Sequence, residues 1–188
     1  MSDYSTLPDE LPEPVDDGAA DHLAGMAMPA LSLPATDGSR IALDEPRAGR
    51  TVLYVYPMTG VPGVPLPEGW NELPGARGCT PESCGFRDHH AELAQAGAPN
   101  VFGLSSQSTS YQAEMVQRLA LPFPALSDES LQLADVLKLP TFEIAGMRLY
   151  RRLTMIVAGA RIEHVFYPVF PPDRHAAEVL EWLAANPR

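Results

Sequence analysis

Cys79 and Cys84 are the residues of this sequence whose type and spacing best suit chemistry, and the chain has no other cysteine. They lie in the stretch RGCTPESCGFRD. There Thr80 suits a helix cap and Pro81 a first helical position, which predicts a helix over 80–97. A thiol beside a helix N-terminus lies among free backbone N–H groups and partial positive charge, which stabilise its thiolate. The pattern therefore predicts nucleophilic or redox chemistry at Cys79.

Two arginines near the first cysteine strengthen this expectation. Arg77 lies two residues before Cys79, and Arg87 follows on the same predicted helix. In such surroundings we expect the thiol pKa to fall from about 8.5 to about 6, which raises the thiolate fraction at pH 7 from about 3% to about 90%. The thiolate is the form of the side chain that attacks.

Cys84 has the position of a second, resolving thiol. Five residues apart on an α-helix, two Cα atoms are roughly 8–9 Å apart and point about 140° from each other. A disulfide needs Cα atoms within about 7 Å, so a Cys79–Cys84 bond requires the start of the helix to unwind. The alternative is that Cys84 is a small buried apolar residue, as free cysteines usually are.

Several motifs in order give the sequence a family resemblance. VLYVYP, GCTPESCGFRD, VFGLSS, FPALSDES and RLTMIV together resemble the peroxiredoxin family of thiol peroxidases. The similarity is greatest to the atypical two-cysteine branch typified by bacterioferritin comigratory protein, and it runs from about Leu31 to the last helix. It implies a thioredoxin-like fold and reduction of hydrogen peroxide and organic hydroperoxides. It also implies recycling by thioredoxin or a similar dithiol, with no metal and no organic cofactor.

The resemblance assigns roles to four residues. Cys79 matches the peroxidatic cysteine, which becomes a sulfenic acid, and Cys84 matches the resolving cysteine of this branch. Arg152, at the start of RLTMIV, matches the active-site arginine that steadies the thiolate and polarises the peroxide. Glu82 matches an acidic position that can orient that arginine.

One part of the family pattern is displaced. The family has a Pro seven residues and a Thr or Ser three residues before the peroxidatic cysteine, where this chain has Glu72 and Ala76. Pro57 and Thr59 look like the displaced equivalents, so about 15 residues are inserted before Cys79. We expect the Thr59 hydroxyl to contact thiolate and peroxide. Thr80 is the alternative, although it also suits a helix cap.

The elements that position these residues read as one α/β domain. We expect a mixed central sheet flanked by helices, a thioredoxin-like fold with an N-terminal hairpin over 31–43. Residues 1–21 hold seven acidic residues and no lysine or arginine, which favours a flexible acidic arm before a domain over 22–188. The long Pro- and Gly-rich loop 60–78 either shapes an apolar entrance for larger hydroperoxides or forms a surface or dimer contact. The remaining elements are expected as strands near 51–57, 100–106, 141–145, 147–157 and 161–169, and helices near 110–121, 129–139 and 172–186.

Charge and composition narrow the function further. The net charge of −11 argues against binding nucleic acid or an anionic membrane through a basic face. No apolar run reaches the length of a membrane span and no secretory signal is visible, so we expect a cytoplasmic monomer or homodimer. Two other classes remain open. One is a non-enzymatic thiol redox sensor, and the other is a thioredoxin-fold copper chaperone that uses the cysteines with a distant histidine such as His164.

Overall fold

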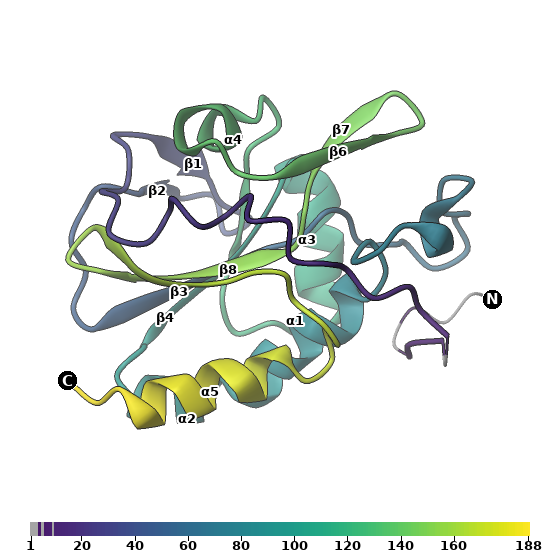
Figure 1. The fold of residues 1–188 in the computed structure, drawn as a ribbon. Helices are drawn as coiled ribbons and strands as arrows, with labels where there is room; N and C mark the ends of the chain where they lie inside the picture. Colours follow the sequence, from purple (N-terminus) through teal and green to yellow (C-terminus); the bar gives the residue numbers. More distant parts are fainter. Residues whose placement is uncertain (1–3, 5, 9) are drawn as a thin grey trace.

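The computed structural model describes residues 4, 6–8 and 10–188. Its elements alternate strands and helices along the chain (Figure 1). In order they are β1 (Ser32–Pro34), β2 (Arg40–Ala42), β3 (Arg50–Val55), the 3-10 turn η1 (Trp70–Glu72), α1 (Cys79–Asp88), α2 (His90–Gln95), β4 (Asn100–Ser105), α3 (Thr109–Arg118), β5 (Ala125–Ser127), α4 (Gln132–Leu137), β6 (Thr141–Ile144), β7 (Met147–Tyr150), β8 (Leu153–Ala158), β9 (Arg161–Phe166) and α5 (His175–Ala185).

A five-stranded mixed sheet in the order β5-β4-β3-β8-β9 forms the centre of the molecule. β3, β4 and β5 run parallel, whereas β8 and β9 add antiparallel strands at the other side. All six residues of β3 are buried, as a continuous β-branched and aromatic run predicts for a strand covered on both faces. This arrangement confirms the α/β, thioredoxin-like fold class.

The helices lie on both faces of this sheet. Alternate β3 residues separate the two cores, because neighbouring side chains in a strand point to opposite faces. Tyr54 packs with side chains of α1, α2, α3 and α5 on one face. Leu53 packs with α4, β1 and the chain around Leu23 on the other. In Figure 1, α1, α2 and α5 lie below the sheet, and α4 lies above it with the hairpins β1–β2 and β6–β7.

The N-terminal hairpin expected over 31–43 is present as β1 and β2. Its turn is built on Asp37, whose carboxylate accepts a hydrogen bond from the Ser39 backbone N–H at 2.9 Å. Gly38 follows with φ of 86°, a conformation that glycine adopts without strain.

The helix expected over 80–97 is two helices, α1 and α2, which meet at His89. His89 leaves helical geometry (φ −94°, ψ 6°), and its ring lies 2.9 Å from the Glu92 carboxylate, three residues on. Neither glycine nor proline marks this break, so the sequence pattern missed it. α1 itself lies against α5, where a Cβ at Gly85 would stand 3.3 Å from the Ala176 side chain.

The described residues of the N-terminal segment lie against the domain, whereas we expected a flexible arm over 1–21. Its apolar residues make the contacts: Leu7 lies at Gly78, and Tyr4 is only 8% exposed. Further along, Asp17 accepts a hydrogen bond from the Tyr167 hydroxyl at 2.9 Å. Residues 1–3, 5 and 9 of the expected arm lie outside the described residues. Composition alone favoured disorder because it averages these few docking side chains with many acidic ones.

The 60–78 loop is attached to the domain by apolar side chains. Trp70, in the single turn η1, is 2% exposed and packs near Phe142 of β6 with ring centroids 6.2 Å apart. Leu149 of β7 and the half-buried Leu66 join the same small cluster. Figure 1 shows the loop projecting from one end of the molecule, the end at which the N-terminal segment also lies.

Candidate active site

Cys79 begins α1 and is buried, with 3% of its surface exposed. The residue before it, Gly78, has φ of 107°, and a Cβ there would lie 2.3 Å from a Pro172 side-chain atom. Only glycine fits this tight entry to the helix. Thr80, expected as a helix cap, lies inside α1, because the cap is Gly78, two residues earlier than the Thr-Pro pattern indicates. Cys79 is therefore at the helix terminus, where backbone N–H groups are free to face an anion.

Arg152 reaches the thiol from the other side of the site. It is 3% exposed, and its Nη2 donates to Cys79 Sγ at 3.1 Å and to the backbone oxygens of Ala76 and Arg77 at 3.3 and 3.2 Å. Its Nη1 donates to the Glu82 carboxylate. We had expected Arg152 to lie on a strand, but it lies in the connection between β7 and β8. The short connection lets its side chain turn into the interior and fixes the guanidinium by four acceptors.

The buried Arg152 guanidinium thus bonds two buried acidic groups, the Cys79 thiol and the Glu82 carboxylate. Burial raises the pKa of the Cys79 thiol, Arg152 opposes this increase, and the Glu82 carboxylate adds to it. Burial also raises the pKa of Glu82, against the opposing effect of Arg152. In this closed arrangement the pKa of Cys79 is therefore not lowered, which corrects our expectation. The helix N-terminus and Arg77 led us to expect a lower value, and the sequence did not reveal how completely the thiol is buried.

Two buried polar atoms at this site have no hydrogen-bond partner within the described part of the chain. They are Glu82 Oε1 and Arg152 Nε, in side chains whose exposed fractions are 0% and 1%. Buried polar groups are otherwise nearly always paired. The site therefore has one free acceptor and one free donor beside the thiol. Within the described ranges, no cluster of three or more His, Cys, Asp or Glu side chains could hold a metal ion.

The Thr59 hydroxyl has Gln107 rather than the thiol as its hydrogen-bond partner. It donates to Gln107 Oε1 at 3.3 Å, and the Thr59 backbone N–H donates to the same oxygen at 3.0 Å. The neighbouring backbone N–H of Met58 lies close enough to the Cys79 thiol to lower its pKa. Tyr111 on α3 holds this segment by donating from its hydroxyl to the Thr59 carbonyl at 3.0 Å.

Cys84 lies in the second turn of α1 and is half-buried. Both cysteines are free thiols, and α1 is continuous from Cys79 to Asp88. The helical separation of roughly 8–9 Å between Cα atoms therefore applies, beyond disulfide range. Burial raises the pKa of Cys84 as well, and Arg87 opposes the increase.

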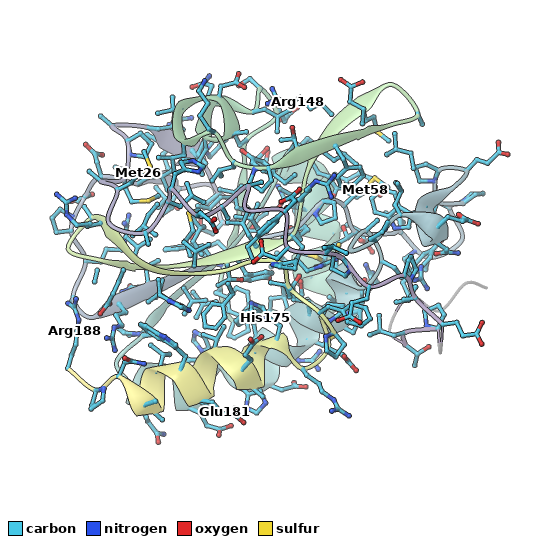
Figure 2. The ribbon with its side chains drawn as sticks, in the orientation of Figure 1. Met26, Met58, Arg148, His175, Glu181 and Arg188 are labelled. Carbon is cyan, nitrogen blue, oxygen red and sulfur yellow. The ribbon has the colours of Figure 1, made fainter. Side chains whose placement is uncertain are left out.

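The opposite side of α1 is braced by a buried histidine. His175, 1% exposed, begins α5, and its Nε2 lies 2.8 Å from the Thr154 hydroxyl of β8. Its ring meets Phe86 of α1 edge-on at 5.7 Å. In Figure 2, His175 lies next to the start of α5, and Met58 lies toward the end of the molecule from which the 60–78 loop projects. The active-site helix is thus packed against α5 on the face away from the loop.

Three residues of the site were missed in the sequence. Gln107 follows the carboxyl end of a parallel strand, a position where polar residues often have functional roles, so a signal was available. Tyr4 is an aromatic residue in an acidic segment, and that contrast was the only sign of its docking. The role of the Met58 amide has no sequence signal, because every residue except proline carries the same group.

Comparison with known proteins agrees with this geometry. The Redoxin family profile matches residues 23–180. The chain is 30% identical over 169 residues to peroxiredoxin Bcp of Escherichia coli K12. This match covers 85% of this chain and 94% of that protein.

Among solved structures, peroxidoxin BcpB of Mycobacterium tuberculosis is similar with a TM-score of 0.69 and 25% identity, over 87% of this chain and 98% of that one. The bacterioferritin comigratory protein of Xanthomonas campestris, studied for alkyl peroxide reduction, has the same fold with a TM-score of 0.67 and 23% identity, over 87% of this chain and 98% of that chain.

These findings confirm the resemblance seen in the motifs and decide between the functions left open. They favour an enzyme over a non-enzymatic redox sensor or a copper chaperone. The family match spans most of the domain, and the relatives are peroxiredoxins over nearly their whole length. The chain belongs to the redoxin family and is a peroxiredoxin of the bacterioferritin comigratory protein type, a thiol peroxidase.

Proposed function

We propose that Cys79 is the peroxidatic cysteine of this enzyme. The observation that carries the proposal is the 3.1 Å contact between Arg152 Nη2 and Cys79 Sγ at the N-terminus of α1. A guanidinium at this distance stabilises a thiolate and has further N–H groups for a peroxide oxygen. Its unpartnered Nε is one such donor. We propose Glu82 as the residue that orients Arg152.

The proposed reaction is a displacement at oxygen. The Cys79 thiolate attacks one peroxide oxygen, the O–O bond breaks, and the other oxygen leaves and takes up a proton as water or an alcohol. Sulfur is oxidised to a sulfenic acid, and the peroxide is reduced. Positive charge from Arg152 and the free N–H groups of α1 stabilises the negative charge that develops on the leaving oxygen.

We propose that Cys84 resolves the sulfenic acid. Its thiol displaces the sulfenic oxygen as water and forms an intramolecular disulfide with Cys79. Because α1 holds the two residues beyond disulfide range, its first turns unwind for this step. Thioredoxin or a similar dithiol then reduces the disulfide by thiol exchange and restores both thiols. Two free thiols that must return to the reduced state fit a cytoplasmic enzyme.

The test is a stopped-flow reaction of the fully reduced protein with one equivalent of hydrogen peroxide, followed by mass spectrometry. We expect rapid formation of a Cys79–Cys84 disulfide in the native enzyme. Cys84→Ser should still react rapidly but accumulate sulfenic or over-oxidised Cys79. Cys79→Ser, the matched substitution, should react no faster than a free thiol. Fast reaction in Cys79→Ser, or a native protein as slow as a free thiol, would exclude the assignment.

The proposed substrates are hydrogen peroxide and organic hydroperoxides. The Xanthomonas campestris relative was studied for alkyl peroxide reduction, which supports the second class here. Steady-state assays with thioredoxin and its reductase would test the reductant. We expect saturating turnover with a dithiol and none with a monothiol such as glutathione. Within the described residues, no helix is long and apolar enough to span a membrane.

A further inference from the structure

We propose that the hollow under the 60–78 loop binds the organic group of hydroperoxide substrates, and that Tyr4 determines the preference for them. The inference rests on the proposed peroxidase role of Cys79. It assigns a function to two segments that flank the catalytic residues, the loop and the N-terminal segment. The substrate class is a hydroperoxide with an aromatic or branched-alkyl group, for which cumene hydroperoxide is the probe.

Two neighbouring spaces lie beside Cys79. A narrow pocket of about 10 Å³ is lined by Cys79 itself, with Thr80, Met58, Gly60 and Gly78. A larger hollow of about 380 Å³ is lined mostly by residues of the loop. Four residues line both spaces: Tyr4, Leu66, Trp70 and Arg77. The hollow therefore lies next to the pocket at Cys79.

The sizes of these spaces divide the substrate into two parts. A space of about 10 Å³ holds roughly one water-sized group, which suits a peroxide oxygen and excludes a carbon skeleton. A hollow of about 380 Å³ is within the range of small-molecule pockets, about 300–1,000 Å³. A peroxide group at Cys79 would thus leave its organic substituent in the hollow.

The walls of the hollow combine apolar and polar side chains. Apolar surface comes from Pro65, Leu66 and Pro67, next to Trp70 and Tyr4, which are 2% and 8% exposed. The lining also holds two opposite charges, Arg77 and Glu72, in addition to Asn71. The Arg77 guanidinium lies over the Tyr4 ring, 4.9 Å from its centroid. The Tyr4 ring thus offers its π face to this charge.

Tyr4 is held in this wall by three contacts. Its ring packs on Gly60, where an added Cβ would lie 2.7 Å from a ring carbon. Its hydroxyl donates to the Val64 carbonyl at 2.7 Å, and Arg77 covers the ring. Gly60 and Val64 belong to the loop, and Arg77 precedes Cys79 by two residues. Tyr4 therefore joins the loop to the chain that enters α1, and removing its ring would remove part of the wall that lines both spaces.

A binding experiment separates this inference from the proposed chemistry. Cumyl alcohol, the product that cumene hydroperoxide would leave, has the same organic group and no peroxide bond. We expect it to change the fluorescence of Trp70 in Cys79→Ser with saturation, in a Trp182→Phe background that removes the second tryptophan. The same titration with Tyr4→Ala added should show binding weakened at least about fivefold. Since the protein lacks the reactive thiol, this result does not depend on peroxidase activity.

A kinetic experiment then tests specificity. The measured quantity is the ratio of kcat/KM for cumene hydroperoxide to kcat/KM for hydrogen peroxide. Tyr4→Ala should lower this ratio at least about fivefold, whereas Tyr4→Phe, which keeps the ring and loses only the hydrogen bond to Val64, should largely retain it. Val15→Ala, at an 82% exposed position in the same segment, should leave the ratio unchanged.

The outcomes distinguish the two proposals. An unchanged ratio in Tyr4→Ala, or equal cumyl alcohol binding with and without the Tyr4 ring, would overturn the inference while the chemistry at Cys79 stands. An equal fall of the ratio in Val15→Ala would also overturn it, because the effect would then belong to the segment as a whole. If neither peroxide reacts rapidly, the proposed function fails, and the cumyl alcohol titration still decides whether the hollow binds an organic group.

Discussion

Replacing Glu82 by Gln should lower the pKa of Cys79. In the native site the Arg152 guanidinium bonds both the thiol and the Glu82 carboxylate, and the carboxylate raises the thiol pKa. Glutamine keeps the shape and an acceptor oxygen but removes the negative charge. The Cys79 thiolate would then be the single anion bonded to Arg152.

The magnitude follows from the geometry. Two groups bonded to one guanidinium have charges roughly 6 Å apart, and with an effective dielectric constant of about 20 their repulsion is about 3 kcal/mol, or about two pKa units. At a pH below the Cys79 pKa of both the native protein and the variant, this difference raises the thiolate fraction about 100-fold. A less basic thiolate is also a weaker nucleophile, by about tenfold for two units. The rate constant with hydrogen peroxide at neutral pH should therefore rise by about tenfold.

The assay is titration of thiolate absorbance at 240 nm in a Cys84→Ser background, so that Cys79 is the only thiol, with Cys79→Ser in the same background as the blank for tyrosine ionisation. Because burial raises the native pKa, native absorbance and peroxidase rate should keep rising with pH above neutrality, whereas Glu82→Gln should level off at lower pH. Glu143→Gln, at an exposed position of β6, is the matched control and should titrate like the native protein. A pKa that stays the same or rises in Glu82→Gln would refute the reasoning. It would mean that Glu82 acts chiefly by orienting Arg152.

Three further substitutions test the supports of the site. Gln107→Ala removes the acceptor that holds Thr59, next to the Met58 amide that lowers the pKa of Cys79, and should raise the thiol pKa by roughly half to one unit in the same absorbance titration. Arg152→Lys keeps the charge but cannot make the paired contacts, and should slow hydrogen peroxide reduction roughly 10- to 100-fold in stopped flow; a native rate would contradict this. Gly78→Ala should lower the free energy of unfolding in urea by more than about 2 kcal/mol, because its Cβ would clash. Gly63→Ala, with positive φ but open space, should lose only about 1 kcal/mol, and equal losses would contradict the clash.

The sequence predicted most of the fold because its strands and helices follow strong local patterns. The β3 run and the Asp37–Gly38 turn each specify their structure within a few residues. The break at His89 and the docking of the N-terminal segment were missed. The first depends on local backbone geometry without a glycine or proline, and the second depends on contacts with residues more than 50 positions away.

The residues of the candidate site were predicted from the sequence, but the opposing electrostatic effects among them were not. Cys79, Arg152 and Glu82 were identified from motifs, and the structure brings all three together. The sequence could not show that Arg152 acts on the pKa of both Cys79 and Glu82, because that depends on how deeply each group is buried. The insertion also hid the pairing of the Thr59 hydroxyl with Gln107, since the geometry of a loop of this length does not follow from its composition.

The close approach of Gly85 to Ala176 limits how far α1 can move. Gly85 directly follows Cys84, and its contact with α5 leaves little room for a side chain. We therefore expect the unwinding that joins the two sulfurs to stop at this contact. Cys84 then lies at the edge of the anchored part, and Cys79 makes nearly all of the movement. A hinge placed at Cys84, the proposed resolving residue, would keep the rearranged segment to six residues, Cys79–Cys84, so the rest of the helical layer need not repack during each catalytic cycle.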